Sequence, residues 1–140
     1  MVESSLGCPT EAFPCTYLGL PISHKKLCKG DLLAWIEKIA DKLPGWKPFL
    51  LNLAGRAALV RFVLSAIPVY ILIAINIPKW FIKAIDKIRR GFFWKGRKEA
   101  IGGSCLVAWE KVQRPLDLGG LGIQNLQVMS WALQIKWLWL

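Results

Sequence analysis

Acidic residues and histidine are scarce in this chain of 140 residues. It has nine Asp and Glu, one His and four Cys, against nineteen Lys and Arg. The acids are isolated and the cysteines form no C-x2-C pair. The sequence therefore predicts neither a two-metal carboxylate site nor a zinc site of the usual kinds. The single histidine, His24, has no second group placed to orient it for nucleophilic catalysis. We therefore expect no catalytic residue, no metal site and no cofactor.

Leader and nucleotide-loop signals are also missing. Residues 1–5 lack the basic flank and apolar run of a signal peptide, so we expect reduced thiols rather than a secreted disulfide scaffold. The glycine run at 119–122 matches neither G-x-G-x-x-G nor G-x-x-x-x-G-K. This favours a strand with a turn over a phosphate-binding loop.

Apolar residues are abundant. They make up 54% of the chain, with eight Trp, six Phe and two Tyr, and the mean hydropathy is +0.39. Such a composition excludes a disordered tail, and the length suits one domain. We predict a mainly α fold, a small helical domain of about four helices with one to three short strands.

Hydrophobic spacing and capping residues place the four helices. The first runs from Asp31, as N-cap, to Leu43; the second begins near Leu53; the third starts at Pro78; the fourth opens at Asn125. Their expected inward positions are Leu32, Ile36, Ile39 and Leu43; Leu53, Ala57, Val60 and Leu64; Phe81, Ile85, Ile88 and Phe92; and Leu126, Met129, Leu133 and Trp137.

Some finer expectations come from the same patterns. The second helix should be mostly buried and should kink or stop at Pro68. Short strands are expected at Tyr17–Ile22, Cys105–Trp109 and Gly119–Ile123. In the last helix, the outward residues are expected to be Gln127, Ser130 and Gln134, and the Trp residues of its final turn point to an exposed apolar patch or a missing partner.

Positive charge is concentrated in the middle of the chain. Residues 44–98 hold eleven Lys and Arg against one acid, Asp86, so the whole formal charge of +10 belongs to this segment. Asp86 is expected to pair with Arg89 and Arg90 on one helix. Basic residues at helical spacing can follow a phosphate backbone, with a plain solvated helix face as the alternative. The candidate nucleic-acid-binding residues, predicted to share one exterior surface, are Arg56, Arg61, Lys79, Lys83, Lys87, Arg89, Arg90, Lys95, Arg97 and Lys98.

Two other features carry alternatives. Trp80 and Trp94 could stack on bases, although core packing is the commoner role for such residues. The apolar run Phe62–Ile77 is shorter than the ~18–20 residues of a spanning helix and contains Pro68. We expect a buried kinked helix followed by a short extended segment there, with membrane association as the alternative.

Six short motifs follow one another along the chain: Tyr17–Ile22, Leu43–Lys47, Ala54–Arg56, Val63–Tyr70, Ile88–Trp94 and Gly119–Ile123. In this order, and over nearly all of residues 7–140, they resemble the reverse transcriptases of plant non-LTR (LINE-type) retrotransposons.

The resemblance implies a place within a longer enzyme. Residues 1–28 would be the end of the palm, 29–98 a basic thumb-like region that holds RNA or an RNA–DNA duplex by its phosphates, and 99–140 a connector with short strands and a C-terminal helix. The catalytic carboxylates would lie before Met1 and the zinc-binding segment after Leu140, so these missing regions are implied partners, and a nuclear location is implied as well. We therefore expect a non-catalytic nucleic-acid-binding fragment, with a non-functional truncated remnant and a membrane-associated basic protein as alternatives.

Overall fold

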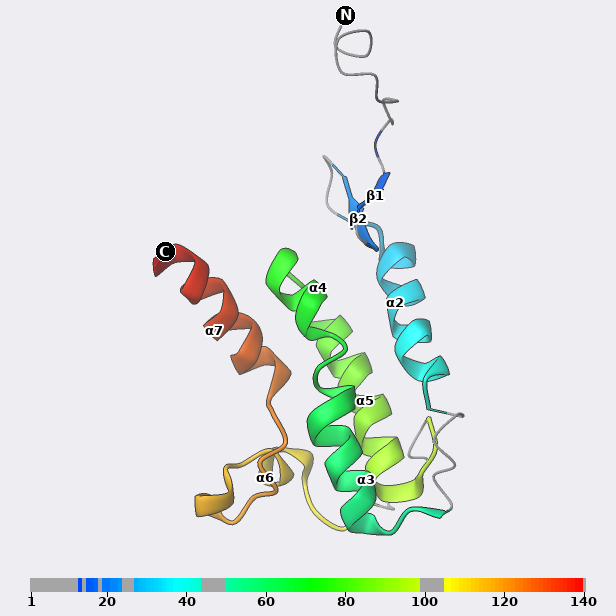
Figure 1. Cartoon of the computed structure of the whole chain (residues 1–140), viewed down its shortest axis with the longest axis vertical. Helices are drawn as coiled ribbons and strands as arrows, with labels where there is room; N and C mark the ends of the chain where they lie inside the picture. The colour runs from blue at the N-terminus through cyan, green and yellow to red at the C-terminus, as the bar shows by residue number, and fades with distance from the viewer. Residues whose placement is uncertain are drawn as a thin grey trace, which may run out of the picture. The chain divides into compact units, whose positions relative to one another are not determined.

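The structure is a computed structural model in which residues 13, 15–17, 19–23, 27–43, 50–98 and 105–139 are described. Across these ranges the fold is mainly helical with one small antiparallel sheet, which confirms the predicted class (Figure 1). The chain divides into two compact units, residues 1–34 and 35–140, and each is considered by itself. His24 lies outside the described residues, as do residues 44–47 of the Leu43–Lys47 motif and residues 99–104.

The first unit contains a two-stranded hairpin. Strand β1 (Cys15–Tyr17) pairs antiparallel with β2 (Leu20–Ile22), and Cys15 lies opposite Ile22. The prediction of one strand over Tyr17–Ile22 is therefore wrong. The chain reverses at Gly19, whose φ of 81° lies in the left-handed region that favours glycine.

Helix α2 spans Lys29–Asp41 and begins two residues before its predicted cap. The Asp31 carboxylate accepts the backbone N–H of Cys28 at 3.2 Å, so it caps the helix by reaching back from the first turn. The expected inward positions that are buried are Leu32, Ile39 and Leu43.

The second predicted helix is present but changes its winding. Helix α3 (Leu53–Leu59) is capped by Asn52, whose Oδ1 accepts the Gly55 N–H at 2.8 Å. It continues as a π-helical turn, η3 (Val60–Leu64), and then stops in turns over 65–68. A stop at Pro68 was expected because proline has no N–H to continue the helix, and it is confirmed.

Helix α4 (Val69–Ala74) comes next, so the extended segment expected after Pro68 is wrong. Pro68 has φ −76° and ψ −10°, close to helical values, and a proline at this position starts a helix as readily as it ends one. Helix α4 packs against the C-terminal helix of the chain.

The second helix is also less buried than predicted. Helix α3 has no buried residue, and in η3 only Val60 and Leu64 are buried, while Phe62 is 67% exposed. Within the described residues, Leu53–Ala74 is long and apolar enough to cross a membrane, and only about a third of its most apolar part is buried. The prediction of a mostly buried helix is therefore wrong.

Helix α5 (Lys79–Lys95) is the central element of the second unit and contacts α3, η3 and the C-terminal helix. Pro78 is its N-cap, and Gly96 closes it with φ 65° and an N–H bond to the Phe92 carbonyl at 2.8 Å. Burial of each large apolar side chain contributes about 1.5–3 kcal/mol. The predicted inner face is confirmed, since all four residues are buried: Phe81, Ile85, Ile88 and Phe92.

The segment after residue 104 forms no strand among its described residues. It contains α6 (Trp109–Val112) and a 3-10 turn, η4 (Leu116–Leu118), so the strands predicted at Cys105–Trp109 and Gly119–Ile123 are wrong. The glycine run closes on its own loop, because the Gly120 N–H bonds the Pro115 carbonyl and the Gly122 N–H bonds the Arg114 carbonyl. These bonds occupy backbone N–H and carbonyl groups that strand pairing would need.

Helix α7 (Leu126–Trp139) completes the second unit. Asn125 caps it as predicted, with Oδ1 accepting the N–H groups of Gln127 at 3.0 Å and Val128 at 3.3 Å. Leu126 is buried as expected, but Ser130, predicted to face outward, is buried too. The helix contacts both α4 and α5, so its covered arc is wider than the apolar spacing suggested.

Candidate nucleic-acid interface

Helix α5 carries a row of cations on the side away from its apolar face. Lys79, Lys83 and Lys87 recur at four-residue spacing and are exposed, and Arg90 lies three residues further on, half-buried. At 1.5 Å per residue the row is about 16 Å long. Nucleotides rise about 3.4 Å along one strand, so the row matches roughly five of them.

These four cations line one groove, with a volume of about 550 Å³, formed by α5, α6 and the start of α7. Helix α6 contributes Trp109 and α7 contributes Trp131 to the same groove. The structure therefore joins basic and aromatic side chains from three helices that are separated in the sequence.

The groove has an excess of positive charge. Its two carboxylates belong to Asp86 and Glu110, against four Lys and Arg. Asp86 accepts a hydrogen bond from Arg89 at 2.7 Å, so its charge is already compensated within the protein. A cleft with one dominant sign of charge concentrates ions of the opposite sign, which favours a polyanion here.

Arg89 is fully buried beneath this groove, which corrects its predicted role as a phosphate contact. One Nη donates to Asp86 at 2.7 Å, and the other donates to the Ser65 hydroxyl and to the Gln124 carbonyl, each at 2.8 Å. Burial lowers the pKa of the guanidinium, while the charge of Asp86 opposes that shift. Arginine stays protonated in proteins, so Arg89 is a structural cation that joins α5, the end of η3 and the approach to α7.

The sequence contained a signal for this burial. Arg89 lies four residues after Ile85, so it falls on the same arc of α5 as the apolar side chains. The predicted pair between Asp86 and Arg89 is confirmed, and it is the partner that a buried guanidinium requires.

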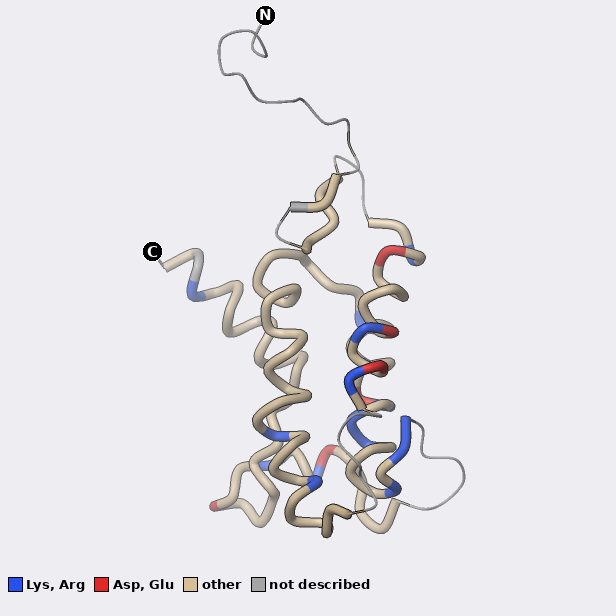
Figure 2. Tube along the Cα trace, turned by 45° about the vertical axis from the view of Figure 1, so that its right-hand side comes forward, with Lys and Arg blue, Asp and Glu red and all other residues tan. Residues whose placement is uncertain are grey.

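The remaining predicted residues do not line this groove, and the trace carries its Lys and Arg on several separate segments (Figure 2). With Arg89 buried, the ten residues do not form one exterior surface. The Arg56 guanidinium donates to the Trp94 carbonyl at 3.2 Å, which fastens α3 to the end of α5. Lys98 pairs with Asp41 at 3.0 Å. Lys95 and Arg97 are exposed at the C-terminal end of α5.

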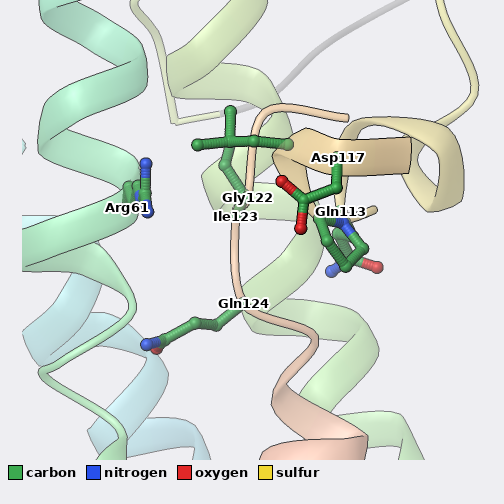
Figure 3. Close-up of a pocket in the computed structure, with 8 residues that line it drawn as sticks. Arg61, Gln113, Asp117, Gly122, Ile123 and Gln124 are labelled. Atoms are coloured by element: carbon green, nitrogen blue, oxygen red, sulfur yellow. The ribbon is translucent and has the colours of Figure 1, made fainter. Parts of the chain in front are cut away.

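Arg61 belongs to a second pocket of about 380 Å³, between η3 and the loop that leads to α7 (Figure 3). Its guanidinium lies against Gly122, where an added Cβ would be 3.4 Å from the guanidinium carbon. The carboxylate of Asp117 lines the same pocket. Opposite charges therefore face this smaller space, which suits a polyanion less well than the larger groove does.

The aromatic residues of the groove, Trp109 and Trp131, were not predicted from the sequence. The two tryptophans proposed for stacking pack against phenylalanines instead: Trp80 lies edge-on to Phe81, with ring centroids 6.1 Å apart, and Trp94 lies against Phe93 at 4.6 Å. For Trp131, which is 53% exposed, the available signal was its position outside the predicted apolar face of α7.

Over the described ranges, no group of three or more His, Cys, Asp or Glu could hold a metal ion.

This chain is similar to a plant protein. Over 120 residues it is 32% identical to a protein of Arabidopsis thaliana that carries the name "Putative ribonuclease H protein". The similarity covers 86% of this chain but only 19% of that protein, so the chain spans about a fifth of the length of its relative. No protein-family model matches the chain, and no solved structure matches it.

Proposed function

We propose that this chain is a non-catalytic nucleic-acid-binding piece of a plant retrotransposon reverse transcriptase of the LINE type. The groove cations of α5 contact the phosphate backbone of RNA or of an RNA–DNA duplex. The single observation that carries the proposal is the row of four cations in one groove, Lys79, Lys83, Lys87 and Arg90. The six ordered motifs and the plant relative support the retroelement origin.

The proposal assigns binding and positioning to this chain, and catalysis to another part of a longer polyprotein. Phosphate contacts fix the register of a nucleic acid without reading its sequence, which is the task of a thumb region. In this proposal residues 29–98 are the thumb-like region and residues 99–140 are the connector. The partners within the polyprotein are a palm region and a zinc-binding region.

Salt dependence tests the proposal. Binding of a labelled RNA–DNA duplex is measured by fluorescence anisotropy at several salt concentrations. The logarithm of affinity should fall with that of salt by about 0.9 for each phosphate neutralised. The variant K79A/K83A should flatten that slope by up to ~1.8, since it removes two groove cations.

The matched control is K95A/R97A, which removes two exposed cations of α5 and its C-terminal end that are not groove-lining residues. It should change the slope less than K79A/K83A does. An identical slope for wild type and K79A/K83A would contradict the proposed contact surface.

A membrane-associated protein is the second candidate, favoured by the apolar segment Leu53–Ala74. The segment contains Arg56 and Arg61 and is interrupted by the π turn and Pro68, all of which weigh against insertion. Co-sedimentation of the chain with neutral phosphatidylcholine vesicles would favour this candidate, and its absence would exclude it.

A further inference from the structure

We propose that the groove between α5, α6 and α7 takes an unpaired strand of RNA or DNA, with a base stacked on the indole of Trp131. This inference rests on the proposed function for its phosphate contacts. It goes further by assigning a role to the bases of the ligand.

Trp131 is the aromatic residue of the groove that is free to stack. Its side chain is 53% exposed, on a helix whose other side contacts α4 and α5. Trp109 is instead held in place, with its ring 5.7 Å from the Arg89 guanidinium and 6.2 Å from the Phe93 ring. We therefore assign Trp131 as the stacking platform and Trp109 as a fixed wall of the groove.

The size of the groove favours an unpaired strand. Its volume of about 550 Å³ is in the range of pockets that hold drug-sized ligands. One or two nucleotides of an unpaired strand fit inside such a space while the backbone of the strand continues along the row of lysines. A double helix could touch the exposed lysines from outside but could not enter the groove. The faces of paired bases are also covered by their neighbours in the duplex, so a side chain can stack only on bases that are unpaired.

The polarity of the groove fits a ligand rich in acceptor oxygens. The donors open to a ligand are the ammonium groups of exposed lysines such as Lys79 and Lys83. The Nε of Arg90 and the Nε1 of Trp109 have no acceptor in the protein, but both atoms are buried, so they do not form part of the groove surface. A nucleotide offers phosphate and carbonyl oxygens, which complement donors, whereas a cationic ligand does not.

The experiment separates base contacts from phosphate contacts. Anisotropy is used to compare a labelled 12-residue oligo(U) strand with an abasic oligomer of the same length, which keeps the phosphates and lacks the bases. The wild-type chain should bind the base-bearing strand roughly tenfold more tightly, because the stacking of a single base is enough to raise the affinity by about that factor. It should also prefer the single strand to a duplex with the same number of phosphates.

The variant W131A should lose the preference for the base-bearing strand while its salt slope stays unchanged. W131F should keep part of the preference, because a phenyl ring still stacks. W139A is the matched control, since Trp139 is 91% exposed on the same helix and does not line the groove. It should behave like wild type.

Two results would overturn the inference: a wild-type preference retained in W131A, or tighter binding of the duplex. A W131A chain that changes only its oligomeric state in sedimentation would also overturn it, and would assign Trp131 to a protein contact. If both oligomers bind equally and with a salt slope that K79A/K83A reduces, the proposed function survives alone. If neither binds, the proposed function fails as well.

Discussion

Replacement of Arg89 by Ala should destabilise the fold strongly without altering contacts to nucleic acid. The guanidinium donates to Asp86, Ser65 and the Gln124 carbonyl, and its removal leaves the hydroxyl and the carbonyl without that donor. Loss of one member of a buried ion pair costs about 3–5 kcal/mol. Because the Asp86 side chain is 23% exposed and can regain water, we expect the lower part of that range.

The assay is urea denaturation of the whole chain, followed by circular dichroism and tryptophan fluorescence. A double-mutant cycle with D86A then isolates the coupling between the two charges, expected at about 1–3 kcal/mol. R89M serves as the control for volume, and it should cost less than R89A because it fills most of the space. A cost below ~1 kcal/mol for R89A would refute the structural role, since a solvated surface arginine loses no more than that.

Binding adds an independent check on the same variant. At a temperature where R89A is still folded, its salt slope should equal that of wild type, because a fully buried side chain neutralises no phosphate. A reduction of that slope similar to the one expected for K79A/K83A would return Arg89 to the ligand-contacting residues.

Three further predictions concern the second unit. N125A should cost about 1 kcal/mol in thermal or urea unfolding, because the Asn125 side chain accepts two N–H groups at the start of α7, and a cost near zero would contradict this cap. G120A should destabilise by more than that, since the added Cβ would overlap the Arg114 carbonyl oxygen, and an unchanged midpoint of unfolding would show that the loop can relax. The wild-type chain should unfold in one cooperative transition by both probes if residues 35–140 form a real core, whereas a broad, probe-dependent transition would favour the remnant hypothesis.

The parts of the fold that depend on one helix could be predicted from the sequence. In α5 the apolar residues from Phe81 to Phe92 recur at helical spacing, and Pro78 and Gly96 mark its ends, so local signals agree with the tertiary packing. The start of α7 at Asn125 was predictable for the same reason.

The hairpin and the loop before α7 were not predictable in this way. Both depend on glycines in left-handed conformations, such as Gly19 and Gly119, and a short apolar segment beside a glycine fits a strand equally well. The groove was not predictable either, since the spacing on α5 shows which cations share a face but not that Trp109 and Trp131 come to lie beside them. Such a site depends on packing between helices far apart in the sequence.

The π turn from Val60 to Leu64 holds one residue more than a regular helical turn. The Ser65 N–H and hydroxyl both bond the Val60 carbonyl, at 3.1 and 2.7 Å, and this places the hydroxyl where it accepts from Arg89. Loss of one residue here, such as the exposed Phe62, would convert the wide turn into a regular one and leave the direction that Ser65 faces nearly unchanged. Homologous copies that lack one residue between Val60 and Ser65 should therefore keep both the serine and the buried arginine at position 89, although the two residues lie far apart in the sequence.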